Sequence, residues 1–312
     1  MKAAQINKYG GNEVWEINQN APKPSPSSEQ ILVKVNSASI NPIDLKIRAG
    51  YLKKMAPLQF PATLGGDFSG IIVALGERVS DFKTGEEVYG QAIILNGGSG
   101  SFAQHLVANV ANLAHKPKKA NFEEAGALPL AGTSALQALK DHIKLQSGQK
   151  ILIHGGAGGI GHIAVQLAKS LGAYVTTTVN TPHINFVKNL GVDQVIDYKN
   201  QNFEEILKDF DAVFDTVGGE TLNKSFAVVK NGGIIVSMLE QPNQELAEKY
   251  GVTALGQGTN TNTPHLIQLA QLVDSGKIKV HIDKTFELSE IKEACDYQEK
   301  SHPRGKVVIK IN

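Results

Sequence analysis

The sequence predicts a two-domain α/β protein, with a β-rich first domain and a doubly wound parallel sheet. Three observations lead to this prediction. The chain has 312 residues, which is more than one compact core usually holds. Its first third consists of short apolar segments separated by turns. From Asn121 onward, strand and helix patterns alternate, which is typical of a parallel sheet with helices on both faces.

The first third has the turn-rich pattern of a small, irregular β-barrel. We predict an opening hairpin with strands at 3–6 and 14–17, followed by a strand at 31–35. A mostly apolar strand is predicted at 68–75, and the β pattern continues through 87–107. These segments predict a barrel with a few short helices.

The middle of the chain switches repeatedly between strand and helix patterns. Strands are predicted at 150–154, 174–179, 194–196, 212–214 and 233–237. Helices are predicted at 122–128, 133–143, 160–171, 183–190, 203–210 and 220–229. The tail has helix patterns at 263–275 and 288–300 and a strand pattern at 306–311, and we expect it to return to the first domain.

Composition narrows the classes of partner. The formal net charge is +1, which gives no electrostatic reason to expect nucleic acid or an anionic membrane as a partner. No apolar run approaches the roughly 20 residues that span a bilayer. The first ten residues lack a signal core, so a cytoplasmic location is expected. The single cysteine, Cys295, excludes an internal disulfide and a zinc site built from several thiolates.

A glycine-rich turn follows the strand predicted at 150–154. Gly156, Gly158 and Gly161 match the pattern G-x-G-x-x-G between a strand and a helix. Such glycines allow a tight turn, close approach of the backbone to a pyrophosphate, and close helix-to-strand contact. The helix that follows presents free N–H groups to the phosphates. The turn predicts a nicotinamide dinucleotide site. The alternative is a glycine turn without a ligand, and a P-loop is disfavoured because His162 stands where its lysine is needed.

The end of the second predicted strand bears on the choice of dinucleotide. NAD-specific sites usually place Asp or Glu about 20 residues past the glycines, where it holds the ribose 2′-hydroxyl. This sequence reads Thr178-Val179-Asn180-Thr181 there, with no acid. His183, Lys188 and Tyr198 can donate hydrogen bonds or positive charge to a 2′-phosphate. We predict NADP (NADPH) as the cofactor; Lys188 and Tyr198 as ordinary surface or packing residues are the alternative.

Further motifs are ordered along nearly the whole chain. They are Asn41-Pro42-Ile43-Asp44, Arg48-Ala49-Gly50, Leu64-Gly65-Gly66-Asp67-Phe68-Ser69-Gly70, Val88-Tyr89-Gly90, Ala127-Leu128-Pro129-Leu130-Ala131-Gly132-Thr133-Ser134-Ala135, Asp215-Thr216-Val217-Gly218-Gly219 and Gly305-Lys306-Val307-Val308. With the glycine turn, they make the sequence similar to the zinc-free branch of the medium-chain dehydrogenase/reductase superfamily. That branch holds the quinone oxidoreductases and the alkenal/enone reductases.

The resemblance implies a GroES-like β-barrel catalytic domain and a Rossmann dinucleotide-binding domain. We expect residues 1–124 and 260–312 to form the first and residues 125–259 to form the second. The resemblance also implies an active site in the cleft between the domains and assembly as a homodimer or homotetramer.

The zinc ligands of related alcohol dehydrogenases are missing. Those enzymes carry a cysteine near the position of Asp44 and Gly-His-Glu in place of Gly65-Gly66-Asp67. The nine histidines show no metal-binding cluster. We therefore predict an enzyme without a metal, in which alcohol oxidation is disfavoured because no Lewis acid polarises the alcohol. We expect hydride transfer from NADPH to a quinone or to the C=C bond of an α,β-unsaturated carbonyl.

The resemblance assigns candidate catalytic residues. Asn41 matches the family residue near the nicotinamide, and its amide can donate to a carbonyl oxygen; a turn residue ahead of Pro42 is the alternative. Lys46 stands where the enone reductases carry a lysine, and a solvated helix face is its alternative. Tyr51 lies one position away from a tyrosine of bacterial quinone oxidoreductases. Asp44 and Asp67 are expected to organise the loop.

The resemblance also places cofactor contacts. Ala157, Gly158, Gly159 and Ile160 are expected at the pyrophosphate, between Gly156 and Gly161. Asn180, His183 and Tyr198 are expected around the 2′-phosphate, beside Thr178. On the nicotinamide side the predicted contacts are Thr133, Gly218, Leu239 and Lys306, and Val217 is a further predicted cofactor contact. A helix N-cap is the alternative for Thr133.

Two other functions remain open at this point. A trans-2-enoyl thioester reductase would need room and basic residues for a carrier-bound substrate. A cofactor-binding protein that has lost catalysis would serve as a redox sensor or a structural protein. The short-chain dehydrogenase pattern Tyr-x-x-x-Lys is absent from the sequence.

Overall fold

The computed structural model describes residues 1–311 and divides into two compact units. The first unit comprises Met1–Leu130, Thr261–Ser275 and the chain from Val280 onward, and the second comprises Ala131–Asn260 and Gly276–Lys279. This division passes close to the predicted domain boundaries at 124/125 and 259/260. Asn312, the last residue of the predicted catalytic domain, lies outside the described residues.

The second unit contains a six-stranded parallel sheet with the order β11-β10-β9-β12-β13-β14. Its strands are β9 (Lys150–His154), β10 (Tyr174–Val179), β11 (Gln194–Asp197), β12 (Phe210–Asp215), β13 (Val229–Ser237) and β14 (Thr253–Gly256). This is the order of a doubly wound dinucleotide-binding sheet, in which the direction of winding reverses between the first and fourth strands. Here the reversal falls between β9 and β12, so the loops that follow these two strands border the switch point.

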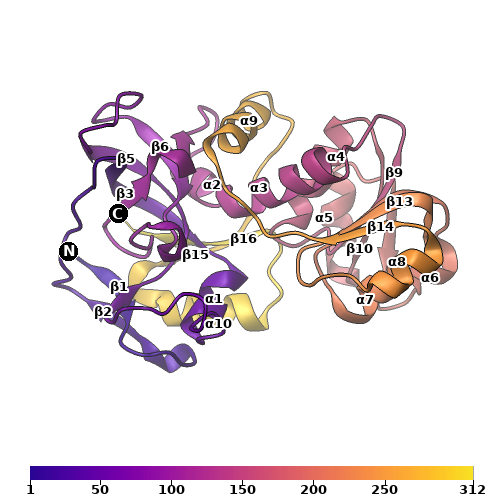
Figure 1. Ribbon diagram of the computed structural model, residues 1–312, viewed down its shortest axis with the longest axis horizontal. Coiled ribbons are helices and arrows are strands. Elements are labelled where there is room, and N and C mark those ends of the chain that lie inside the picture. The colour runs from indigo at the N-terminus through magenta and orange to yellow at the C-terminus, as the bar shows by residue number, and fades with distance from the viewer. Residues whose placement is uncertain (312) are drawn as a thin grey trace. The chain divides into compact units, whose positions relative to one another are not determined.

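Helices cover both faces of this sheet (Figure 1). Leu152, Val213 and Ile235 project to one face and pack with residues of α6 (Phe203–Ile206), α7 (Gly219–Ser225) and α8 (Gln244–Tyr250). On the other face, α4 (Gly161–Ser170) packs on β9 and β10, and α5 (Ile184–Asn189) packs on β11. The central strands are buried on both faces, which explains why they read as continuous apolar or β-branched runs.

The first unit is β-rich. One sheet pairs β1 (Ala3–Ile6) with β2 (Trp15–Asn18) and β4 (Ala62–Thr63). A larger sheet runs through β15 (Ile282–Glu287), β16 (Lys306–Lys310), β3 (Gln30–Ile40), β5 (Asp67–Leu75), β6 (Glu87–Gln91) and β8 (Leu113–His115), and β7 (His105–Asn109) pairs with β3. The tail strand β16 lies antiparallel to β3, with Val307 opposite Ile40.

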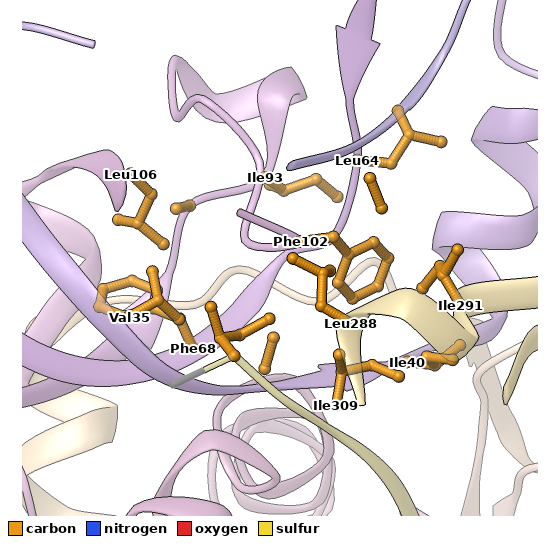
Figure 2. Close-up of a cluster of buried hydrophobic side chains, with 14 of the residues drawn as sticks. Val35, Ile40, Leu64, Phe68, Ile93, Phe102, Leu106, Leu288, Ile291 and Ile309 are labelled. Carbon is orange, nitrogen blue, oxygen red and sulfur yellow. The ribbon is translucent and has the colours of Figure 1, made fainter. Parts of the chain in front are cut away.

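The helices of the first unit are α1 (Pro42–Arg48), α2 (Phe122–Gly126), α9 (Thr263–Asp274) and α10 (Ile291–Lys300). Figure 2 shows the core, in which Phe102 lies among side chains of both sequence-distant parts, including Leu288 and Ile309 from the tail. Helix α3 (Pro129–Leu136) runs across the boundary between the units and continues as a π-helix over Gln137–His142. No helix among the described residues is long and apolar enough to cross a bilayer.

The α/β class with a parallel doubly wound sheet is confirmed, and most predicted elements are present. The helix predicted at 220–229 was too long, because α7 ends at Ser225 and β13 begins at Val229. Gly232 has a φ of +77° inside β13, and the register with β12 shifts at the start of the strand. Because the strand begins irregularly, its first residues lack the periodicity from which a strand is predicted.

Candidate functional site

The glycine turn of the second unit contains glycines that are required for different structural reasons. It connects β9 to α4, and Gly155 takes a φ of +72° at its start. A Cβ atom on Gly156 would lie 2.0 Å from Oγ1 of Thr177, and one on Gly161 would lie 2.1 Å from the carbonyl oxygen of Gly155. Both positions exclude any side chain because of their own surroundings in the protein.

Gly158 has no such internal reason to be glycine. A Cβ atom there would meet only the carbonyl oxygen of Gly155, at 3.4 Å, which is ordinary contact. Within the described part of the chain, the backbone N–H groups of Gly159 and Ile160 have no acceptor. A side chain on Gly158 would therefore obstruct only a group that approaches the turn from outside. These residues fit the pyrophosphate of a dinucleotide, which needs close backbone approach and unpaired N–H donors.

Thr178 on β10 holds the turn in place. Its Oγ1 lies 3.0 Å from Nδ1 of His154 and accepts from the N–H of Gly155 at 3.3 Å. The other ring nitrogen of His154 lies 2.9 Å from Oγ of Ser225. Burial lowers the pKa of His154 to about 4, so the ring is neutral and works as a fixed hydrogen-bonding spacer beneath the turn. Thr178 is itself buried.

The predicted 2′-phosphate region lies where β10 and β11 end side by side. Asn180 follows β10, and its buried Oδ1 has no partner among the described residues. Tyr198 follows β11 and donates its N–H to the carbonyl oxygen of Val179 at 3.1 Å. The residue is 50% exposed. His183 ends a short 3-10 turn two residues after Thr181. The structure thus gathers Asn180, His183 and Tyr198 on adjacent segments.

Sequence reasoning missed an acid in this region. Asp197, the last residue of β11, accepts from Oγ1 of Thr181 and Nδ2 of Asn200, both at 2.7 Å, and from the N–H of Lys199 at 3.1 Å. These hydrogen bonds, the one from Thr181 foremost, hold the pKa of Asp197 below its ordinary value. The carboxylate is occupied by its own loop. Asp197 reaches this region because it pairs with Val179 across the sheet, and a local sequence pattern does not show such a pairing.

The segments after β12 and β13 come together through Asp215. Its carboxylate accepts from the N–H groups of Val217 and Gly218 at 3.0 Å and from Oγ of Ser237 at 2.9 Å. A Cβ atom on Gly218 would lie 3.2 Å from Leu239. Val217 and Leu239 are both exposed, so the predicted contacts on these two loops are accessible. Thr133, on α3, is buried, and its Oγ1 has no partner among residues 1–311.

A buried polar cluster forms the chemical centre of the first unit. We call Asn41, Asp67 and Lys306 the amide cluster. Asn41 donates from Nδ2 to Oδ2 of Asp67 at 2.8 Å, and Nζ of Lys306 donates to Oδ1 of Asn41. Nζ of Lys306 also lies 3.8 Å from Oδ2 of Asp67. Asp44 accepts from the N–H of Asn41 at 2.8 Å, which fixes the start of α1.

The charge state of Asp67 follows from its donors. Besides Asn41, its oxygens accept from Oγ of Ser39 at 3.2 Å, the N–H of Leu130 at 3.0 Å and Nε2 of Gln91 at 3.4 Å. Burial raises the pKa of Asp67, whereas the Lys306 ammonium and these donors oppose that rise. Because every hydrogen-bond partner of the carboxyl group is a donor, we take Asp67 as ionised and Lys306 as its counter-ion.

Asp44 differs from Asp67. Burial raises the pKa of Asp44 to about 7, the nearby Asp67 charge adds to the rise, and the hydrogen bond from Asn41 and the Lys306 charge oppose it. Its Oδ1 is buried and has no partner in the described chain. Asp44 therefore carries a proton over much of the range below neutral pH.

The structure does not bring Lys46 and Tyr51 into the amide cluster. Lys46 lies on the exposed side of α1, between the buried Leu45 and Ile47. Tyr51 follows α1 and is 79% exposed. Their catalytic roles stay predictions. Lys306, predicted as a cofactor contact, is only 3% exposed and bonded within the cluster, and no local pattern pointed to that partnership.

Among residues 1–311, no three His, Cys, Asp or Glu side chains gather where they could hold a metal ion. Cys295 is buried on α10, and burial raises the pKa of its thiol to about 12, so it is an unreactive core residue.

Comparison with known proteins places these features in a family. Residues 27–118 match the model of the alcohol dehydrogenase GroES-like domain, which confirms the predicted GroES-like domain, and residues 190–309 match a model described as zinc-binding dehydrogenase. A 2-methylene-furan-3-one reductase of Solanum lycopersicum is 36% identical over 319 residues, which cover 99% of this chain and 79% of the relative.

Two further relatives agree. An NADPH-dependent alkenal/one oxidoreductase of Arabidopsis thaliana is 34% identical over 99% of this chain and 79% of its own length. The solved structure of the quinone oxidoreductase of Coxiella burnetii superposes with a TM-score of 0.92 and is 35% identical in sequence. The match covers 100% of this chain and 99% of that structure's chain. The chain therefore belongs to the medium-chain dehydrogenase/reductase superfamily, in its quinone and enone reductase branch.

Proposed function

We propose that this protein is an NADPH-dependent reductase of quinones or of the C=C bond of α,β-unsaturated carbonyl compounds. The observation that carries this proposal is the amide cluster, in which the Asn41 amide is held by the buried pair of Asp67 and Lys306, and Asp67 stands where related zinc enzymes carry the glutamate of Gly-His-Glu. The names of the three relatives support the same reaction class, and the name of the Arabidopsis thaliana relative supports the same cofactor.

The residues of the second unit hold the cofactor in this proposal. The free N–H groups of Gly159 and Ile160, above the bare backbone of Gly158, bind the pyrophosphate. The exposed Tyr198 hydroxyl and Asn180 meet the adenosine end, where the engaged carboxylate of Asp197 leaves room for a 2′-phosphate. When bound, NADPH supplies a hydride from C4 of its nicotinamide.

Asn41 performs the electrostatic task in the first unit. One N–H of its amide is bound to Asp67, and the second has no partner among the described residues. We propose that this second N–H donates to the carbonyl oxygen of the substrate. As the hydride adds to the β-carbon, negative charge moves to that oxygen and the amide stabilises it. Protonation of the resulting enolate at the α-carbon completes the reduction.

We also propose that the reaction needs no zinc. The zinc-dependent members need about three protein ligands in a tetrahedral set. Gly66 stands at the position of one such ligand, and Asp67 is bound to Asn41 and paired with Lys306. The donor set of the amide cluster suits an ammonium ion, since Lys306 already provides the positive charge beside Asp67.

Two coarser expectations belong to the same proposal. We propose a cytoplasmic protein, which its single buried cysteine supports because no disulfide has to form. We also propose a homodimer or homotetramer, by likeness to the family. Light scattering on the purified chain tests the assembly, and fractionation of the source cells tests the location.

The direct test follows the absorbance of NADPH with the purified chain and three acceptors: methyl vinyl ketone, benzoquinone and a crotonyl thioester. Turnover with the first two, unaffected by a zinc chelator, supports the proposal. Turnover with the thioester alone favours an enoyl thioester reductase. Tight NADPH binding without turnover on any acceptor favours a cofactor-binding protein that has lost catalysis. Replacing NADPH by NADH in each assay measures the cofactor preference.

A further inference from the structure

Lys306 is unusual among the lysines because its ammonium group is almost wholly buried. The residue opens β16, whose pairing with β3 sets Val307 opposite Ile40 and so brings Lys306 alongside Asn41. Its N–H donates to the carbonyl oxygen of His281 at 2.9 Å, which anchors the backbone. The side chain then has its Nζ within hydrogen-bonding reach of Asn41 and near Asp67.

Both polar atoms of the Asn41 amide are hydrogen-bonded within the amide cluster. Lys306 donates to Oδ1, and Nδ2 donates to Asp67, which is itself held by Ser39, Gln91 and Leu130. Its residue precedes Pro42, which restricts the backbone to the extended region, and φ and ψ are −125° and 152°. Only one direction remains for the second N–H of the amide.

The charge of Lys306 also acts on that N–H. An ammonium group that donates to the oxygen of an amide draws electron density toward that oxygen, so the N–H groups become stronger donors. The effect is large in a buried site, where water does not screen it. Replacing a buried ion pair by apolar residues is often neutral or stabilising, so stability alone is a weak reason to keep Lys306 and Asp67 here.

We propose that Lys306 is a positioning residue for the reduction: it orients and polarises the Asn41 amide, so that the free N–H stabilises the oxyanion of the substrate. This inference rests on the proposed function of Asn41. Lys306 provides a fixed positive charge that acts on the substrate through Asn41, whereas in zinc relatives a metal ion polarises the oxygen directly.

The test compares Lys306→Met with wild type. We expect kcat with methyl vinyl ketone to fall by about 10- to 100-fold, which is less than the roughly 100- to 1,000-fold loss when an oxyanion donor is removed, because the Asn41 donor itself remains. The Kd for NADPH, measured by fluorescence titration, should change less than about twofold. The loss with benzoquinone should be smaller, because this stronger electrophile needs less polarisation. Lys310→Met, on the exposed end of the same strand, is the matched control and should match wild type.

The outcomes separate the two proposals. An inactive wild type overturns the proposed function and the inference with it. An active wild type beside an unchanged kcat for Lys306→Met overturns the inference alone, as does a tenfold or greater rise in the Kd for NADPH, which would make Lys306 a cofactor contact. If Lys306→Met does not fold, the double variant Asp67→Asn/Lys306→Met removes both charges, and the same dependence on the acceptor is expected.

Discussion

The glycine turn and the amide cluster are built in opposite ways. The turn is continuous in sequence, from Gly155 to Gly161, and it lies within one βα unit, between β9 and α4. The amide cluster joins Asn41 to Lys306, which are 265 residues apart in the chain. A binding site for an invariant group such as a pyrophosphate can be encoded locally. A site whose chemistry depends on buried charge needs tertiary structure to bring the charges together.

The largest predicted effect is on stability and follows from removing the carboxylate of Asp67. Asp67→Ala leaves the Lys306 ammonium buried without its counter-ion, and we expect a loss of about 3 to 5 kcal/mol in the free energy of unfolding. Chemical denaturation followed by circular dichroism measures it. The exposed Asp81→Ala serves as the control and should change stability by less than about 0.5 kcal/mol. Equal stabilities for the two variants would mean that the ion pair does not form.

The second prediction concerns Asp44 and pH. The pKa of Asp44 is about 7 in the folded state against 3.8 for an unperturbed carboxyl, so the folded protein holds this proton more tightly than the unfolded chain. The contribution to stability is therefore full below pH 4 and is lost as pH rises to 7, by up to about 4 kcal/mol.

Asp44→Asn should remove this loss, because the amide carries no proton to release. The readout is the difference in unfolding free energy between variant and wild type at several pH values between 4 and 8. A difference that does not grow with pH would contradict a raised pKa for Asp44, whose charged neighbours are Asp67 and Lys306.

The third prediction separates binding from folding in the glycine turn. Gly158→Asp places its side chain toward the outside, so we expect unchanged thermal stability but a rise of about 100-fold or more in the Kd for NADPH, from blocked approach and charge repulsion. Gly161→Ala should do the reverse and lower the melting temperature, because its Cβ would lie 2.1 Å from the Gly155 carbonyl oxygen. Calorimetry and fluorescence titration on both variants decide the matter, and similar behaviour of the two would refute the distinction.

The smallest predicted effect lies at the adenosine end. Tyr198→Phe removes one exposed hydroxyl, so we expect kcat/KM with NADPH to fall by about three- to tenfold, the value of one hydrogen bond, with no change for NADH. Steady-state kinetics with both cofactors measure this ratio. A parallel fall for both cofactors would place the hydroxyl away from the 2′-phosphate.

The elements that sequence predicted best are those with strong periodicity or a sharp motif, such as β9, the glycine turn and α4. Sequence analysis missed β14, β15 and α8. β15 alternates weakly, with charged Asp283 and Lys284 side by side, and α8 is mostly polar, so neither has a clear apolar face. These elements are identified by the strands and helices that they pack against, which a local window does not contain.

The residues of the candidate site also fall into those that sequence could predict and those that it could not. The glycines and the missing acid after β10 could be read directly, because they depend on order along the chain. The partnership of Lys306 with Asn41 and Asp67, and the capture of Asp197 by Thr181, depend on strand pairing between distant segments. Sequence patterns indicated that Asp44 and Asp67 organise a loop. Both carboxyl groups are buried, so the donors and the Lys306 ammonium around Asp67, which come from distant segments, distinguish the ionised carboxyl from the protonated one.

The pairing of β16 with β3 also has a consequence for synthesis. The second unit is nearly continuous, so a ribosome releases almost all of it before the tail appears. The position of β16 beside β3 stays empty until residues 306–310 emerge, after the second unit. Lys306 arrives with that strand. A nascent chain can therefore acquire its dinucleotide-binding turn before the tail is made, and it gains the charge that acts on Asn41 only after the second unit has been synthesised.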